Sequence, residues 1–148
     1  MDNLWLIKEA DGETPCKTGE KILTGTKIRL MHLNTGANLH SHNVRSPLSN
    51  QQEVTGFGEG GEGDRGDDWT VLADGANRRG VTYWEKDQVV YFRHADTDKF
   101  LGCAKDAQFT RQNCGHNCPM MNHLEIFGRT KPDAFTEWKA ETGIFLSK

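Results

Sequence analysis

Polar and apolar residues alternate in short runs along this chain, which is the pattern of β-strands rather than of helices. The alternation is clearest over residues 27–33 and 88–94, and turn-forming residues follow these runs at 34–38 and 96–98. No segment combines helical spacing of apolar residues with capping residues, so the pattern predicts an all-β fold with about four short strands per unit. Loops are predicted where Gly, Pro and Asn accumulate, at 43–51, 56–67, 73–80 and 104–119.

The sequence also repeats itself. Matching residues recur at one constant spacing: His32 and His94, Thr35 and Thr97, Leu39 and Leu101. A repeat of this length indicates a β unit rather than a helical solenoid. We therefore predict one structural domain made of the tail of an earlier unit (1–7) and two whole units (8–72 and 81–146). Repeated polar residues such as His32 and His94 are expected to be scaffold.

Three tryptophans recur in register with the repeat: Trp5, Trp69 and Trp138. This recurrence predicts that they belong to the core of each unit rather than to a stacking platform. Trp84 occupies the place of Ile22 in the other copy, and it is the tryptophan that is the candidate to face a ligand.

Composition narrows the class of protein. The 148 residues include 16 Gly and 4 Pro and carry a net charge of −3, which describes a folded, turn-rich domain without the basic surface that nucleic acid requires. No stretch approaches the length of an apolar membrane span. The start of the chain lacks the pattern of a signal peptide, and its end is not a retention signal.

Particular segments resemble a known family. Residues 39–42, residues 51–58 and Trp69 look like the MIR motif of protein O-mannosyltransferases, of inositol-trisphosphate and ryanodine receptors, and of the stromal cell-derived factor 2 family. Residues 43–69, 83–87 and 138–140 resemble the second and third repeats of stromal cell-derived factor 2-like proteins. The resemblance covers nearly the whole chain and is weakest over 103–122.

The resemblance implies a β-trefoil, which three MIR motifs build together. Since two whole motifs are recognised here, we expect an incomplete trefoil with two of its three lobes. Family members have a signal peptide, a complete first repeat and usually a lumenal retention tail. A fragment or truncated gene model is therefore expected, and an assembly in which another chain supplies the missing strands is the alternative.

The resemblance further implies a binding module without enzymatic activity. It would work in the lumen of the endoplasmic reticulum with a J-domain co-chaperone, BiP and unfolded clients, in protein folding and quality control. A lectin-like module that binds mannose-type glycans is the alternative. An enzyme that uses the thiols or a metal of the Cys-rich loop is a third class, and no catalytic residues, cofactor or metal are predicted.

A polar set near the first predicted hairpin is the candidate ligand site. Its members are His40, His42, Arg45, Gln51, Gln52 and Glu53. The two histidines alternate along one strand and are expected on one face, where paired donors and acceptors suit sugar hydroxyls. The favoured interpretation is that these groups satisfy one another and the loop backbone.

An acidic, Gly-rich loop over 57–68 is the candidate partner surface. Its acids are Glu59, Glu62, Asp64, Asp67 and Asp68. The spacing does not match a calcium-binding loop, and such a run is usually solvated. We expect a mobile acidic edge that attracts a basic partner protein.

The long loop of the second unit gathers Cys103, Cys114 and Cys118 with His116 and His123. A disulfide that closes the loop, free thiols and a zinc site remain alternatives, and the disulfide is favoured. A Cys–His nucleophile is not favoured, because nothing nearby supplies an orienting group or oxyanion donors.

Overall fold

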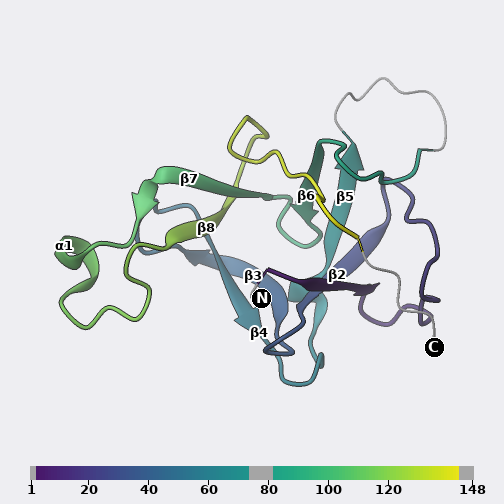
Figure 1. Cartoon of the computed structure of the whole chain (residues 1–148), viewed down its shortest axis with the longest axis horizontal. Helices are drawn as coiled ribbons and strands as arrows, with labels where there is room; N and C mark the ends of the chain where they lie inside the picture. The colour runs from purple at the N-terminus through teal and green to yellow at the C-terminus, as the bar shows by residue number, and fades with distance from the viewer. Residues whose placement is uncertain (1–2, 74–81, 144–148) are drawn as a thin grey trace.

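The computed structural model describes residues 3–73 and 82–143. Within them one antiparallel sheet closes on itself (Figure 1). Its strands are β1 (Trp5–Glu9), β2 (Lys27–His32), β3 (Asn38–Arg45), β4 (Gln52–Phe57), β5 (Trp69–Ala73), β6 (Val90–His94), β7 (Phe100–Gln108) and β8 (Leu124–Arg129). The strand order is β1-β2-β3-β4-β8-β7-β6-β5, and β2 also pairs with β5. Strands β2 to β8 therefore form a barrel, and β1 lies outside it along β2.

The prediction of an all-β chain is confirmed, but the predicted loops overlap the ends of strands, most of all at two places. Strand β3 continues to Arg45 and β7 continues to Gln108, each after a register shift in its hairpin. The short helix α1 (Arg111–Cys114) and the 3-10 turn η1 (Arg65–Asp67) also lie in segments predicted as loops. Such single turns are too short to produce a hydrophobic period. Most of the predicted loop at 73–80 lies outside the described residues.

The two predicted units are built alike. Ile28 pairs with Trp69 in the first unit, and Val90 pairs with Trp138 in the second. The indole Nε1 of Trp69 donates to the Leu39 carbonyl at 2.8 Å, and Nε1 of Trp138 donates to the matching Leu101 carbonyl at 2.8 Å.

The barrel core gathers around the fully buried Trp69, Val71 and Val90. The prediction that Trp5 belongs to the core is wrong, because β1 is an edge strand and leaves Trp5 44% exposed. Trp84 is partly buried and packs edge-on against Phe92, with ring centroids 5.5 Å apart, so it does not fulfil the role of a ligand-facing ring.

A buried carboxylate ties the two units together. Glu125 of β8 accepts hydrogen bonds from the backbone N–H of Leu48 at 2.6 Å and of Ser49 at 3.1 Å. The Ser46 hydroxyl donates to the same carboxylate at 2.9 Å. The turn before β4 is therefore held by the second unit, which fixes the end of β3 where candidate site residues lie.

Replacing Trp69 with Phe should destabilise the barrel by about 2–4 kcal/mol, because the change leaves a cavity and removes the bond to the Leu39 carbonyl. The matched change Trp5→Phe should cost less than about 1 kcal/mol, because that ring is largely exposed. Equilibrium unfolding in urea measures both values. Equal losses in the two variants would contradict the packing described here.

Candidate functional site

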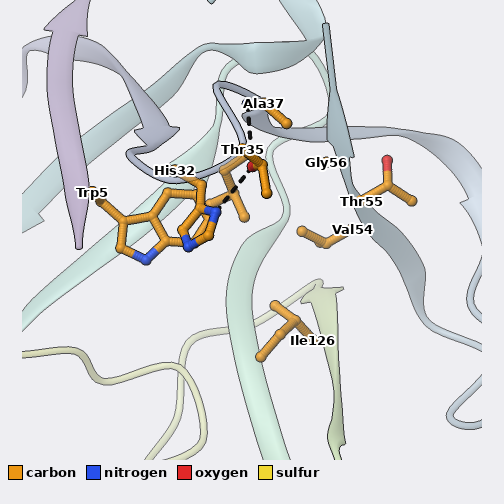
Figure 2. A pocket seen from close by; sticks show the side chains of 9 residues that line it. Trp5, His32, Thr35, Ala37, Val54, Thr55, Gly56 and Ile126 are labelled. Carbon is orange, nitrogen blue, oxygen red and sulfur yellow. Dashed lines mark hydrogen bonds between the residues drawn. The ribbon is translucent and has the colours of Figure 1, made fainter. Parts of the chain in front are cut away.

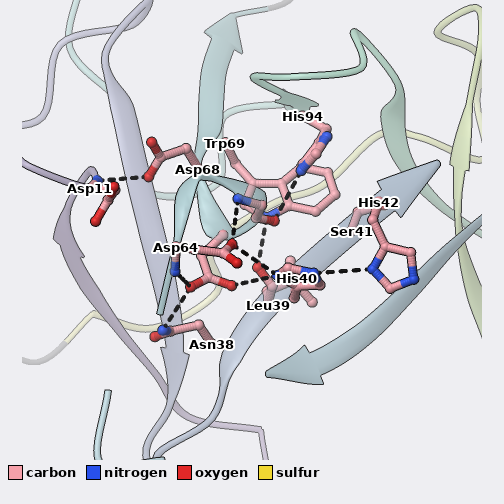
Figure 3. Close-up of polar contacts among 12 residues, drawn as sticks. Asp11, Asn38, Leu39, His40, Ser41, His42, Asp64, Asp68, Trp69 and His94 are labelled. Carbon is pink, nitrogen blue, oxygen red and sulfur yellow. Dashed lines mark hydrogen bonds and ion pairs between the residues drawn. The ribbon is translucent and has the colours of Figure 1, made fainter. Parts of the chain in front are cut away.

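A polar pocket of about 480 Å³ opens between β3, the η1 turn and the turn from β6 to β7 (Figure 3). Side chains around it include His40, His42, Asp64, His94 and Thr97. Strand β3 supplies the first two, since alternation along the strand brings His40 and His42 to the same side. The η1 turn lies within the acidic loop, and Asp64, which caps this turn, lies opposite the two histidines.

Asp67 is the centre of the site. Its carboxylate is fully buried, and its Oδ1 lies 2.8 Å from Nδ1 of His40. Its Oδ2 accepts from Nδ2 of Asn38 at 3.1 Å and from the backbone N–H of Asp64 at 2.9 Å. A buried carboxylate needs such partners because its desolvation is costly. These bonds anchor the acidic loop to β3, whereas the sequence predicted a mobile acidic edge.

Two glycines permit this close approach. A Cβ at Gly63 would collide with Oδ2 of Asp67, and a Cβ at Gly66 would collide with the His40 ring. The Gly-rich composition of the loop thus has a steric cause.

A chain of contacts runs outward from His40. Its Nε2 lies 3.1 Å from Nδ1 of His42, and Nε2 of His42 lies 3.2 Å from Oε2 of Glu53 on β4. His40 is buried, whereas the side chain of His42 is 45% exposed. The site thus consists of two imidazoles in series between a buried carboxylate and a half-exposed one.

A second network lies deeper. Nδ1 of His94 lies 2.8 Å from the Thr97 hydroxyl, and its Nε2 lies 2.9 Å from the Gly66 carbonyl. Nε2 of Gln52 donates to the Thr97 hydroxyl at 2.7 Å and to the Ser41 hydroxyl at 2.8 Å. Because Gly66 presents a carbonyl, the Nε2 of His94 donates, and its Nδ1 accepts from Thr97 when the ring is neutral.

Burial shifts the pKa of two groups beside the pocket. Desolvation lowers the pKa of His94 below its ordinary value of 6.5, and the Gly66 carbonyl opposes this shift. Desolvation raises the pKa of Asp68, although the backbone N–H of Asp11 donates to that carboxylate at 2.9 Å. The inner part of the pocket therefore disfavours added charge.

The chain is similar in sequence to known proteins of one family. A family model described as MIR domain matches residues 2–101. The chain is 44% identical over 145 residues to stromal cell-derived factor 2 of Mus musculus, which covers 98% of this chain and 62% of the relative. It is 39% identical over 147 residues to the stromal cell-derived factor 2-like protein of Dictyostelium discoideum, covering 99% of this chain and 63% of that protein.

The chain belongs to the MIR-domain proteins of the stromal cell-derived factor 2 family. It spans somewhat less than two thirds of the length of these curated relatives.

Two solved structures of this architecture are similar. The crystal structure of the SDF2-like protein from Arabidopsis thaliana matches with a TM-score of 0.78 and 32% identity, covering 96% of this chain and 71% of that one. The S. cerevisiae protein O-mannosyltransferase Pmt1-Pmt2 complex matches with a TM-score of 0.69 and 27% identity, covering 91% of this chain and 18% of that one.

The predicted ligand residues of this family member are only partly brought together. His40, His42 and Glu53 form the contact chain, whereas Gln52 is buried in the deeper network. Oε1 of Gln51 accepts from Nε of Arg129 at 3.2 Å, away from the pocket. Arg45 is exposed at the end of β3, beyond the register shift that begins after Ser41.

The acidic loop divides into exposed and buried members. Glu59, Glu62 and Asp64 are exposed, whereas Asp67 and Asp68 are buried. The spacing of acids in the sequence does not separate these groups, because the burial of Asp67 depends on β3 residues far away in the chain.

The cysteines lie apart from both networks. Cys114 and Cys118 are joined by a disulfide beside α1, and Cys103 on β7 is a free, half-buried thiol. Desolvation raises the pKa of Cys103, which disfavours its reactive thiolate. Nε and Nη2 of Arg111 both lie against Nε2 of His116, at 3.1 and 2.7 Å.

Sequence reasoning missed Asn38, which carries no local motif because it reaches the site through strand pairing. His94 was predicted to be scaffold, and the contact that recurs in both copies agrees with this: Nδ1 of His32 lies 2.9 Å from the Thr35 hydroxyl, and Nδ1 of His94 lies 2.8 Å from the Thr97 hydroxyl. An apolar hollow of about 330 Å³ was also not foreseen; Trp5, Leu39, Val54 and Ile126 line it, and the Trp5 ring lies 5.1 Å from His32 (Figure 2).

Acid should destabilise the fold through His94. Its folded-state pKa lies below 6.5, so the unfolded chain takes up a proton first as the pH falls. Stability is thus unaffected by this group above about pH 6.5 and is lost below it, by at most about 1.4 kcal/mol per pH unit. Urea unfolding between pH 7 and 5 should show a smaller loss for His94→Gln than for the unsubstituted chain. The same loss in both would contradict this origin.

Proposed function

We propose that this chain is a non-catalytic MIR module that binds chaperone proteins in the lumen of the endoplasmic reticulum. The proposal is supported by 36–44% identity to stromal cell-derived factor 2 and its like proteins of mammals over 98% of the chain. That family resemblance implies work beside a J-domain co-chaperone and BiP, with unfolded proteins as clients. Among the described residues, no helix is long and apolar enough to span a membrane.

The proposed partner surface rests on one observation: the acidic loop is held against β3 by its buried residue Asp67. Glu59 and Glu62 are exposed, while Asp67 anchors the same loop from below. A fixed set of like charges orients an approaching basic partner better than a free loop does, because less freedom is lost on binding. We therefore propose Glu59 and Glu62 as contacts for a basic surface of the co-chaperone.

The polar residues of the pocket support binding rather than chemistry. Imidazole Nε2 of His42 is occupied by Glu53, and both Asp67 oxygens accept hydrogen bonds or an imidazole contact. A general base needs a free acceptor within reach of a substrate proton. Among the described groups of the pocket, His42 and Asp67 are therefore already paired with neighbouring side chains.

We further propose that the two units are two lobes of a β-trefoil. Their matching strand pairs and indole bonds support a repeated lobe. The apolar hollow beside Trp5 is where a third lobe would pack, since its lining of Leu39, Val54 and Ile126 is typical of a covered surface.

A longer chain that carries a further MIR motif before residue 1 should protect Trp5 from acrylamide quenching; unchanged quenching would count against the third lobe.

A lectin-like module remains the second candidate. It is favoured by the similarity to a protein O-mannosyltransferase complex whose structure contains a sugar donor. The half-exposed His42 and Glu53 and the exposed Arg45 are the groups that would meet sugar hydroxyls.

Substituting both Glu59 and Glu62 with Lys should weaken binding to a purified J-domain co-chaperone at least tenfold at physiological salt, because two attractive charges become repulsive. Biolayer interferometry with the immobilised chain measures this. The control variant Glu13→Lys/Glu85→Lys changes the net charge equally at exposed positions outside the loop and should bind like the unsubstituted chain.

The same measurement separates the two candidate functions. Equal weakening by both double variants, or no co-chaperone binding at all, would overturn the loop as the partner surface. Loss of client or partner binding in millimolar mannose, abolished by His42→Ala, would support the lectin instead.

A further inference from the structure

The hairpin arm between β7 and β8 is the part of the second unit that the repeat does not explain. In the first unit residues 46–51 join the matching strands β3 and β4, whereas residues 109–123 join β7 and β8. The family model matches residues 2–101 and ends before this arm. The arm, with α1 in it, lies at one end of the long axis of the molecule (Figure 1). The barrel therefore closes through strands that lie outside residues 109–123.

Hydrogen bonds close the base of this arm independently of its disulfide. The N–H of Phe109 donates to the His123 carbonyl at 2.9 Å, and the N–H of Asn122 donates to the Phe109 carbonyl at 2.9 Å. The Cys114–Cys118 disulfide lies within this closed base and joins residues only 4 apart in sequence. A crosslink removes less entropy from the unfolded chain when the loop that it closes is short. The disulfide therefore adds little to the stability of the fold.

The disulfide is open to other molecules. Both of its cysteines are half-buried, and Gly115, His116 and Asn117, which lie between them, are exposed. Thiol–disulfide exchange begins when a thiolate reaches one of the two sulfur atoms, so the reaction requires this accessibility.

The charges around the disulfide favour a thiolate. Residues 108–123 contain one arginine, two histidines and no acidic side chain. Arg111 lies three residues before Cys114 in α1, and residues at this spacing share one face of a helix. Nε and Nη2 of Arg111 donate to Nε2 of His116, at 3.1 and 2.7 Å, and this contact holds the guanidinium over the segment between the two cysteines. Because a neighbouring cation stabilises a thiolate, Cys114 is the better leaving group of the pair.

An exposed apolar side chain lies close to the disulfide in sequence. Met120 follows Cys118 by two residues and is 43% exposed. The flexible thioether side chain of methionine adapts to varied apolar surfaces. Cysteine and apolar residues are mostly buried in folded proteins, so their joint exposure is characteristic of an unfolded chain. An unfolded polypeptide with free thiols is therefore the class of partner that suits this arm.

We propose that the Cys114–Cys118 disulfide exchanges with the thiols of unfolded, cysteine-bearing polypeptides. A thiolate of the polypeptide attacks Sγ of Cys118 and forms a mixed disulfide, and Sγ of Cys114 leaves as a thiolate beside Arg111. A second thiolate of the polypeptide then attacks its own sulfur in the mixed disulfide and releases Cys118.

The exchange balances without a further reactant. The polypeptide dithiol loses two electrons and two protons as it becomes a disulfide, and the cysteines of the arm gain both as they become two thiols. One disulfide of the arm is used for each one formed, so the step is stoichiometric and is compatible with a module that is not an enzyme. The inference is independent of the proposed co-chaperone binding, because it rests on the arm alone.

The first test maps the attacked sulfur with reduced glutathione at pH 7. A Cys16→Ala/Cys103→Ala chain is used, so that both free thiols are absent and the disulfide is intact. After the reaction is stopped with iodoacetamide, peptide mass spectrometry should find glutathione on Cys118 and the alkyl group on Cys114.

The rate of this reaction tests the role of the cation. Arg111→Gln should slow the opening of the disulfide about fivefold, because the leaving thiolate loses its neighbouring positive charge. Lys105→Gln is the matched control, since it removes one positive charge from an exposed position on β7 outside the arm. Its rate should stay within about twofold of that of the parent chain, because an exposed charge farther away is screened.

The second test is transfer to an unfolded polypeptide. Reduced, unfolded RNase A is mixed with the same parent chain under nitrogen. RNase A should gain disulfides while the mass of the chain rises by about two daltons, as its disulfide becomes a dithiol. With the further substitutions Cys114→Ser/Cys118→Ser the chain should leave RNase A reduced, and its urea midpoint should equal that of the parent.

Each opposite result would overturn the proposal: glutathione mainly on Cys114, equal rates for Arg111→Gln and Lys105→Gln, or RNase A that stays reduced. A clearly lower urea midpoint for Cys114→Ser/Cys118→Ser would also overturn it, because the disulfide would then be a structural crosslink.

Discussion

The carboxylate of Asp67 is the constraint around which this end of the molecule is organised. A charge with no exposed surface costs several kcal/mol unless its oxygens are paired, and here His40, Asn38 and the Asp64 backbone pair them. Two of these partners come from β3 and one from the loop itself. The loop is thus folded down onto the strand, and its remaining acids are held outward at fixed positions.

The repeat explains the barrel but not the site. Both units place a tryptophan against a leucine carbonyl and pair it with the strand that begins the unit. Because these contacts serve closure, they recur. The His40–Asp67 pair does not recur, and the second unit fills the same space with Gly102 and the packed Phe127 ring. A buried polar pair is therefore present in one copy of a shared scaffold and absent from the other.

How much of the structure the sequence predicts depends on how far apart along the chain the interacting residues lie. Alternation is local, so β2 and β6 and the shared face of His40 and His42 were predictable. Spacing between the copies was also visible, which identified Trp69 as core. The pairing of β2 with β5, which closes the barrel, could not be predicted, since it joins segments that are distant in sequence.

Burial was the quantity that sequence reasoning judged least well. An acidic, Gly-rich run is normally solvated, and nothing in the run itself shows that Asn38 and His40 lie beneath Asp67. For Trp5 the error was the opposite one. Its recurrence in register with the repeat predicts a buried ring, whereas its position on an edge strand leaves the ring exposed. Both errors arise from neighbours that are far away along the chain.

Glu53 connects the two surfaces of the molecule. In the second unit, its counterpart Glu125 is buried and holds the turn that contains Leu48 and Ser49. Glu53 has no such turn among the described residues and holds His42 instead. A further lobe that presented a similar turn to Glu53 would compete with His42 for the same carboxylate. Packing beside β4 and the position of the His42 ring are therefore coupled through a single carboxylate.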